Sequence, residues 1–562
     1  MIASRRAHAT LLPAAAALLL LQVVGPRAFA AGPGRTGADI ADRIETALDA
    51  WDIEAAQRAL DDLLSRDGRS ATAAYYRGRV LFEQGKYLES ATAYEEARTR
   101  GAGQIEGFEV EARLARAAAE EVKGDEVHDS AHFVLLTRPG KDSLLAPYAL
   151  DALERAYAAL TQDLGVAPAA KIRVEVYESA QALARVSPLT VAEIKASGTI
   201  ALCKYNRLMI TSPRALLRGY AWLDTLSHEF THYLVTKKGR NSVPIWLQEG
   251  LAKFLETRWR GAPGLAVDES STVLLTRAAR DKRLIPFAAM HPSIAKLPTQ
   301  EMAALAFAEV EAAMKLLYQH GGQRALTELV AAMAAGVSDE NAVAQAYGKP
   351  FSQFEQDWRA DLLKPRREPA TQAPGSARPL ASRKLVFKED AKKKGSAEDA
   401  DAAAERPTDP EAKRSVRLGE IFFARRRWAA AAVEYGKARA RLPREVPLLA
   451  RRYAFAQIQL GRFGEAEGAL AAAVARDPQD EAAQVLYARV LEKRGDFGKA
   501  RGALDAAIAV DPFDPELHDV YVAVAKALKD EALLEREKRA LALALGEKAP
   551  QTAPKDTKEG SP

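Results

Sequence analysis

Apolar residues recur at helical spacing over two long stretches, residues 38–125 and 414–546. Positions three and four residues apart are apolar there, a pattern that predicts helices with one buried face. Alanine and arginine are abundant and aromatic residues make up only 7% of the chain, which favours helices over β-sandwiches. We therefore expect a mostly α-helical protein, and 562 residues are enough for several domains.

The C-terminal stretch repeats itself. GRFGEAEGALAAAVARDP at 461–478 aligns with GDFGKARGALDAAIAVDP at 495–512, a shift of 34 residues, and an earlier copy includes Trp428. Near the N-terminus, WDIEAAQRAL at 51–60 aligns with GKYLESATAY at 85–94 at the same shift. This period and the closing Asp-Pro resemble the tetratricopeptide repeat, in which paired helices bury their faces only against neighbouring pairs. The resemblance implies an α-helical tetratricopeptide-repeat block on each side of the centre.

Residues 127–362 have a different pattern. SAHFVLLTRP and KIRVEVYES predict strands, and LLAPYALDALERAYAALTQDLG between them predicts a helix. TIALCKY and NRLMITS predict a hairpin that turns at Tyr205 and Asn206. The centre is therefore expected to be a separate α+β domain.

The first 30 residues have the pattern of a secretory signal. MIASRRAHAT is basic, LLPAAAALLLLQVV is apolar, and Ala28 and Ala30 form an A-x-A site. We expect cleavage after Ala30 and an exported bacterial protein, periplasmic or secreted. The apolar run is shorter than the roughly 20 residues that span a bilayer. Contact with a membrane is expected only if the signal stays uncleaved.

Two other segments lack a core-forming pattern. Residues 363–413 are rich in proline, lysine and alanine and predict a flexible linker, whose polarity only KLVF at 384–387 interrupts. Residues 547–562 predict a disordered tail. Removing residues 1–30 takes away three arginines and no acids, so the formal charge falls from +5 to +2. Nothing in this balance predicts nucleic-acid binding. The single cysteine, Cys203, cannot form an intramolecular disulfide.

The stretch LSHEFTHYL, residues 226–234, has the pattern H-E-x-x-H. On a helix, His228 and His232 differ by one turn and project from the same face, so both imidazoles can reach one zinc ion. Glu229 then lies beside the open position of the metal. Ser212 with Pro213 predicts the start of this helix, and Lys237 to Gly239 predict its end. The alternative is a structural helix with two histidines.

A catalytic zinc needs a third protein ligand. NSVPIWLQEGLAKFLET at 241–257 predicts a second helix, antiparallel to the first, and its Glu249 is the candidate ligand. Glu256, two turns further on, faces the same way but lies farther from the turn.

This arrangement resembles the gluzincin metallopeptidases, and more closely the bacterial peptidase MA-like group. In that group H-E-x-x-H is followed by Pro-x-Trp-Leu-x-Glu-Gly, which PIWLQEG at 244–250 matches. The resemblance implies a gluzincin-like α+β fold, Zn²⁺ as cofactor, His228, His232 and Glu249 as its ligands, and Glu229 as catalytic base.

Some parts of the site stay open. Lys253 stands four residues after the third ligand, where thermolysin-like enzymes often have an acid, so Asp224 is our candidate to orient a ligand. A group that stabilises the oxyanion is not assigned; the candidates are Tyr233, Tyr318, His320 and Tyr347.

The leading hypothesis is an exported zinc metallopeptidase whose repeats recruit a protein partner or substrate. An extended peptide substrate is expected along the strand near NRLMITS, because a sheet edge can align its carbonyls. The alternatives are a tetratricopeptide-repeat scaffold with a structural or weakly active zinc domain, and a zinc hydrolase of another acyl compound.

Overall fold

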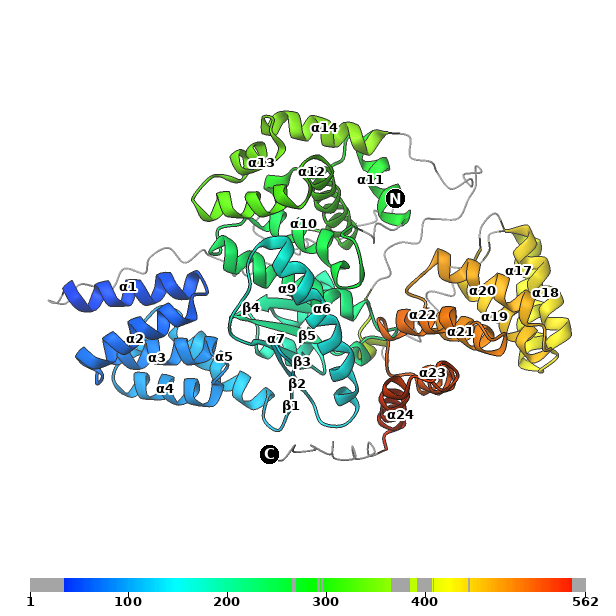
Figure 1. Cartoon of the computed structure of the whole chain (residues 1–562), viewed down its shortest axis with the longest axis horizontal. Coiled ribbons are helices and arrows are strands. Elements are labelled where there is room, and N and C mark those ends of the chain that lie inside the picture. The colour runs from blue at the N-terminus through cyan, green and yellow to red at the C-terminus, as the bar shows by residue number, and fades with distance from the viewer. Residues whose placement is uncertain are drawn as a thin grey trace, which may run out of the picture.

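A computed structural model describes residues 35–264, 269–290, 294, 297–364, 385–391, 407, 409–442 and 445–547. The expected signal at 1–30, most of the expected linker and all but the first residue of the expected tail lie outside these ranges. Within them, the chain is mostly α-helical with one small sheet, as predicted. Figure 1 shows the sheet-containing centre between two groups of helices that come from the two ends of the chain.

The N-terminal helices pack as antiparallel hairpins beside the central domain (Figure 1). They are α1 (Arg35–Asp49), α2 (Ile53–Asp67), α3 (Ala71–Glu83), α4 (Tyr87–Thr99) and α5 (Phe108–Glu121). Small residues such as Gly78 let the hairpin partners approach closely, since a Cβ there would lie 3.0 Å from the Tyr94 ring.

The central sheet has five strands in the order β1-β2-β3-β5-β4. They are β1 (Glu126–Asp129), β2 (Phe133–Thr137), β3 (Ile172–Tyr177), β4 (Ala201–Lys204) and β5 (Arg207–Thr211). β3 pairs parallel with β2 and with β5, and the two outer pairs are antiparallel. The two predicted strands and the hairpin are confirmed. β1 was not predicted, because its sequence EVHD is largely exposed and carries no apolar alternation.

The β4–β5 hairpin turns at Tyr205 and Asn206, whose φ angles of 56° and 55° suit a two-residue turn with positive φ at both central positions. β5 lies between β3 and β4, so NRLMITS itself is not at a sheet edge, and the edge near it that could pair with a peptide is β4. Alternation along a sequence identifies a strand but not its neighbours in the sheet. The free edge on this side is β4.

Helices cover the sheet and continue into a helical subdomain. They are α6 (Ala146–Leu164), α7 (Ala180–Arg185), α8 (Val191–Ser197), α9 (Trp222–Gly239), α10 (Ile245–Leu255), α11 (Glu269–Arg280), α12 (Gln300–Ala334), α13 (Asp339–Tyr347) and α14 (Phe351–Leu363). α6 and α9 pack on one face of the sheet. Phe230 of α9 is fully buried there, with its ring 5.3 Å from that of Phe133 on β2 and 6.0 Å from that of Tyr157 on α6.

The start of α9 differs from the prediction. Pro213–Ala215 form a short 3-10 turn, and the helix begins only at Trp222. Gly219 separates the two with φ of 61°. The predicted end is correct: Gly239 is the last helical residue and Arg240 adopts the left-handed conformation. α10 begins directly after Pro244, as predicted.

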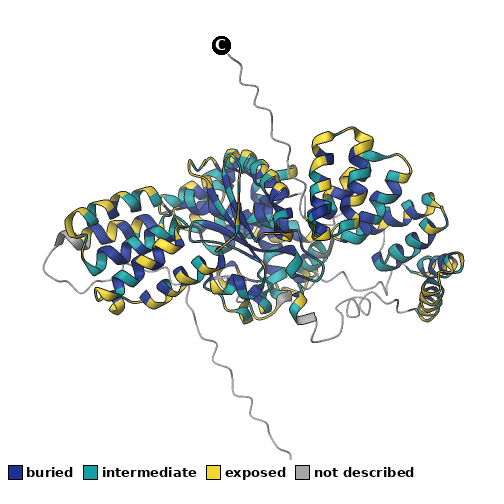
Figure 2. Ribbon diagram, turned by 90° about the horizontal axis from the view of Figure 1, so that it is seen from below, coloured by how far each residue is buried: buried dark blue, intermediate teal, exposed yellow. Residues whose placement is uncertain are grey.

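The C-terminal helices form four consecutive hairpins. They are α17 (Pro410–Ala424), α18 (Trp428–Arg441), α19 (Pro447–Gln459), α20 (Phe463–Arg476), α21 (Glu481–Lys493), α22 (Phe497–Ile508), α23 (Pro515–Leu528) and α24 (Glu531–Leu545). Buried residues line the interior of each hairpin and of the central domain (Figure 2). One continuous apolar core contains residues of α1–α5, of the central domain and of α21–α24. The outer helices α17–α20 have small separate clusters.

Residues 385–391, inside the expected linker, pack against the central domain and end in the short helix α15 (Lys388–Ala391). Phe387 forms an antiparallel bridge with Leu216 and is 3% exposed. The KLVF segment therefore has a docking place, which its sequence alone did not assign. No helix among the described residues is long and apolar enough to cross a membrane.

Candidate metal centre

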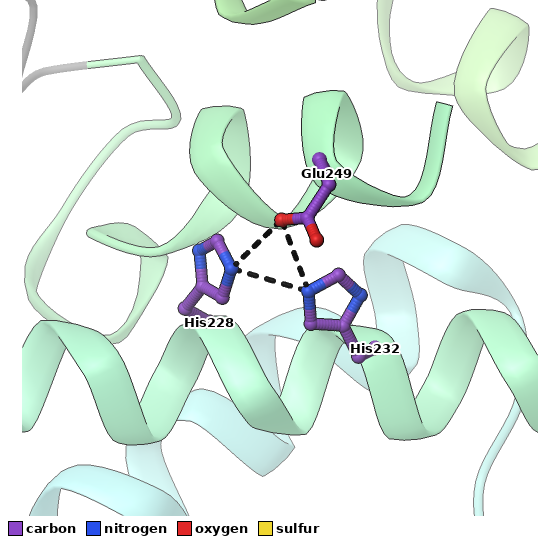
Figure 3. A group of neighbouring side chains, drawn as sticks. All are labelled: His228, His232 and Glu249. Carbon is purple, nitrogen blue, oxygen red and sulfur yellow. Dashed lines mark hydrogen bonds and ion pairs between the residues drawn. The ribbon is translucent and has the colours of Figure 1, made fainter. Parts of the chain in front are cut away.

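His228, His232 and Glu249 converge on one point between α9 and α10. The two histidines rise from adjacent turns of α9, and Glu249 reaches toward them from α10 (Figure 3). The Nε2 atoms of the histidines lie 3.1 Å apart. Oε2 of Glu249 lies 3.4 Å from Nε2 of His228 and 3.5 Å from Nε2 of His232.

These distances fit a zinc ion. Ligand atoms about 2.0–2.1 Å from a tetrahedral ion lie about 3.3 Å from one another, which is the spacing of this triangle. The donor set, two imidazole nitrogens and a carboxylate oxygen, is also one that zinc takes in catalytic sites. The three side chains are 13–20% exposed, so the site is mostly enclosed yet open to solvent on one side. A fourth position is therefore available for a water molecule or a substrate oxygen.

Local sequence explains why these side chains meet. The i, i+4 spacing sets both imidazoles on one face of α9, while Phe230 faces the sheet and anchors the helix. The turn from Arg240 to Pro244 reverses the chain, so that α10 returns beside α9 and brings Glu249 over the histidines. Gly250 lets α12 approach, because a Cβ there would lie 2.9 Å from Met314.

Glu229 lies next to this group and is 7% exposed. Burial raises the pKa of its carboxyl, and the positive charges of His232 and His228 only partly offset that effect. The backbone N–H of Cys203 on β4 faces this carboxylate and counteracts the rise in its pKa. The base candidate is thus held between the histidine pair and the free edge of the sheet.

The charge balance of the site is negative. Burial opposes a charge on His228, but its hydrogen bonds with Glu249 and Glu256 outweigh burial and raise the pKa of His228 to about 10. Burial likewise opposes ionisation of Glu249, yet the two histidines hold the pKa of this carboxyl well below its usual range. A site that draws positive charge this strongly suits a cation.

The carboxylate of Glu256 contacts the His228 ring on the side away from Glu249. Its Oε2 lies 3.3 Å from Nδ1 of His228, the ring nitrogen that faces away from Glu249. Lys253 donates to the other oxygen of Glu256 at 2.5 Å. A carboxylate on the second nitrogen of a metal-binding histidine sets its tautomer and orientation. Lys253 therefore has a role here, since it holds the carboxylate that orients His228.

Asp224 does not orient a histidine, and that expectation was wrong. Its carboxylate accepts hydrogen bonds from Nε1 of Trp259 at 2.8 Å and from Arg260 at 2.6 Å. The reason is geometric: Asp224 lies one turn before His228 on the same helix, whereas Nδ1 of His228 points toward α10. The carboxylate that orients His228 is that of Glu256, at the end of α10 and two turns after Glu249. The sequence had suggested this residue only as a more distant ligand.

The four candidates for oxyanion stabilisation have other contacts. Tyr233 donates to Asn206 at 3.1 Å and Tyr347 donates to Asp357 at 2.8 Å. The ring of Tyr318 packs on Phe254, and the ring of His320 packs on Tyr347. Tyr220 was not among the candidates; burial and then the charge of Glu229 raise its pKa, and its hydroxyl donates to the Thr211 carbonyl.

Comparisons with known proteins support the domain architecture. Residues 152–364 match the Peptidase MA superfamily, and residues 42–105 and 457–523 match tetratricopeptide repeats. The chain therefore contains a Peptidase MA superfamily domain with tetratricopeptide repeats on both sides. No curated protein matches the chain.

Two solved structures show a weak likeness. Native yeast LTA4 hydrolase has 11% sequence identity and a TM-score of 0.30, and the match covers 74% of this chain and 66% of the hydrolase. The APC/C hetero-tetramer Cut9-Hcn1 has 12% identity and a TM-score of 0.24, with 91% of this chain and 94% of that chain covered. Both TM-scores are too low to indicate a shared overall fold.

The contacts of Glu256 and Asp224 generate a paired prediction. Glu256→Gln is expected to weaken zinc binding about 10-fold to 100-fold, because a neutral amide orients His228 less strongly. Asp224→Asn, the matched control on α9, is expected to leave zinc affinity nearly unchanged. Competition with a chelator of known affinity measures both. Equal zinc affinities for the two variants would refute the role given to Glu256.

Proposed function

We propose that this protein is an exported zinc metallopeptidase that hydrolyses peptide bonds in its central domain. The observation that carries the proposal is the triangle of His228 Nε2, His232 Nε2 and Glu249 Oε2 at zinc-ligand spacing, with Glu229 buried beside it. The Peptidase MA superfamily match of residues 152–364 supports the same reaction class.

In this mechanism His228, His232 and Glu249 would hold the ion, and Glu256 would keep the His228 ring in position. When bound, zinc supplies a Lewis acid that acidifies a water molecule and polarises the scissile carbonyl. Glu229 takes a proton from the attacking water, a task for which its raised pKa suits it. The same carboxyl then passes the proton to the leaving amine.

The free edge of β4 is the proposed path of the substrate backbone. Thr211 donates to Ile200 across the hairpin, and hydrogen bonding alternates along an antiparallel pair, so the N–H groups of Ala201 and Cys203 point away from β5. The Cys203 N–H already reaches Glu229. A peptide that pairs with this edge would therefore present its carbonyls beside the base.

We also propose that the outer repeats serve a protein partner. Tetratricopeptide repeats generally mediate protein–protein contacts, and Figure 1 shows α17 and α18 at the end of the block farthest from the centre. Partner and substrate are expected to be proteins or peptides.

Glu229→Gln tests catalysis. We expect zinc content equal to that of the wild type and a kcat reduced by about 10²-fold to 10⁴-fold, since the amide cannot take the proton. Metal analysis and turnover of a mixed-peptide library measure the two quantities. If wild type and variant cleave equally, Glu229 is not the base. If neither cleaves, yet a partner binds equally with and without metal, the chain is a repeat adaptor.

Ala201→Pro tests the substrate path. Proline removes the outward N–H of an edge strand without breaking the β4–β5 ladder, and it leaves in place the Cys203 N–H, which faces Glu229. We expect kcat/KM to fall at least about tenfold, the effect of one lost hydrogen bond to the substrate backbone. Ala201→Gly keeps the N–H and is the matched control, with activity near that of the wild type. Full activity of the proline variant would contradict pairing at this edge.

Export is tested at the N-terminus. The full sequence is expressed in bacterial cells, and the protein is purified from the periplasm or the medium. Mass spectrometry is expected to find Ala31 as its first residue, because the A-x-A site ends at Ala30. The proposal would be overturned if the protein were found only in the cytoplasm and still carried residues 1–30.

A further inference from the structure

The first turn of α9 is completed by a segment almost 300 residues further along the chain. Among the described residues, no side chain caps this helix. Instead the backbone N–H groups of Tyr220 and Trp222 donate to the carbonyls of Val510 and Ala509, each at 3.1 Å. These carbonyls belong to the end of α22.

The pairing satisfies two helix ends at once. The first N–H groups of a helix and the last C=O groups of another have no partner within their own helix. The N-terminus of a helix is also partly positive and the C-terminus partly negative, so the end of α22 and the start of α9 attract each other. If α22 moved away from α9, the backbone N–H and C=O groups at these two helix ends would lose their hydrogen-bond partners.

Trp222 and Gly219 show that this contact is close. The indole N–H of Trp222 donates to the carbonyl of Ile508 at 2.8 Å, and Trp222 is fully buried. A Cβ on Gly219 would lie 2.3 Å from the Val510 oxygen, and the φ of 61° at this residue disfavours other side chains. Glycine is thus required where α22 approaches.

A second contact joins α24 to α6. The hydroxyl of Tyr148 donates to Glu537, with both carboxylate oxygens 3.0 Å away. Glu537 is fully buried and also contacts Nδ1 of His518 at 2.8 Å. The apolar core that runs from the central domain into α21–α24 surrounds this polar contact.

Residues 385–391 brace the same region. Val386 accepts a hydrogen bond from the N–H of Leu217 at 2.9 Å, and Phe387 pairs with Leu216. Glu389 accepts from Gln181 of α7. The loop that leads into α9 is therefore held by this segment on one side and by α22 on the other.

We propose that the last C-terminal repeats, α22–α24, are a positioning part of the metal centre rather than a free recruiting arm. They fix where α9 begins, and through Trp222 they set the place of His228, which lies six residues further on. Trp222 and Tyr148 are the positioning residues. The activity readout rests on the proposed peptide hydrolysis and zinc retention rests on the proposed metal centre, whereas association of the two parts rests on neither.

The experiment uses the full-length protein, with a site for a sequence-specific protease inserted before Asp401. After the chain is cut, sedimentation velocity measures whether the two parts stay together, and metal analysis measures zinc retention over a range of dilutions. Tyr148→Phe removes the hydroxyl that reaches α24. The matched control is Tyr157→Phe, also on α6, whose hydroxyl donates to Pro168 within the central domain at 2.9 Å.

We expect the cut wild-type protein and the Tyr157→Phe control to stay associated and to keep zinc and kcat. Tyr148→Phe is expected to raise the dissociation constant of the two parts at least about tenfold, the effect of losing a hydrogen bond to a charged group. Upon dilution its zinc affinity and kcat should fall as the parts separate, and adding the C-terminal part should restore both. A folding defect alone would not give this dependence on concentration.

Two results would overturn the proposal. One is separation of the parts with zinc affinity and kcat unchanged. The other is equal association of Tyr148→Phe and Tyr157→Phe at every dilution. If the uncut protein cleaves no peptide, the proposed function fails, but zinc retention upon separation still decides the role of the repeats.

Discussion

The metal centre depends on one constraint, the placement of α9. Two of the three converging side chains and the candidate base lie on this helix, and zinc-ligand spacing tolerates errors of only a few tenths of an ångström. Both ends of the helix are held by repeats. At its C-terminal end, Lys237 donates to the Trp51 carbonyl, and the Tyr233 ring lies 5.7 Å from that of Trp51. At its N-terminal end, Trp222 bonds to the end of α22.

This double attachment changes the interpretation of the repeats. A repeat array usually behaves as a row of units that contact only their neighbours, with its surface free for partners. Here the N-terminal repeats and α21–α24 share one apolar core with the central domain. Arg207 of β5, 1% exposed, has its guanidinium 5.0 Å from the Phe82 ring and 4.7 Å from the Tyr87 ring, both of the N-terminal repeats. The hairpins of α17–α20 have separate apolar clusters, so they are where we propose that a partner binds.

Sequence predicted what depends on local spacing and missed what depends on distant contacts. The i, i+4 histidines, the reversal before Pro244 and the turn at Tyr205 each follow from a few adjacent residues, and the structure places them as expected. The start of α9 was predicted nine residues too early, at Ser212 and Pro213, because the backbone N–H of its first residue, Trp222, is satisfied by Ala509 at the end of α22, a contact that local sequence does not reveal. The prediction that Asp224 orients a histidine was wrong for a similar reason. Which carboxylate faces Nδ1 of His228 depends on how α9 and α10 pack together. The roles of the site residues themselves stay predictions.

Lys253 and Glu256 show how the site balances its charge without the acid often found four residues after the third ligand. Glu229, Glu249 and Glu256 surround two imidazoles, and Lys253 offsets only one of these carboxylates. Unpaired buried charges are costly, so an empty site would have to take up protons, which is what the raised pKa of His228 expresses. A divalent cation would supply two positive charges and would leave both imidazoles neutral, the form in which histidine binds metal. The same carboxylates that would make an empty site unfavourable thus favour a filled one.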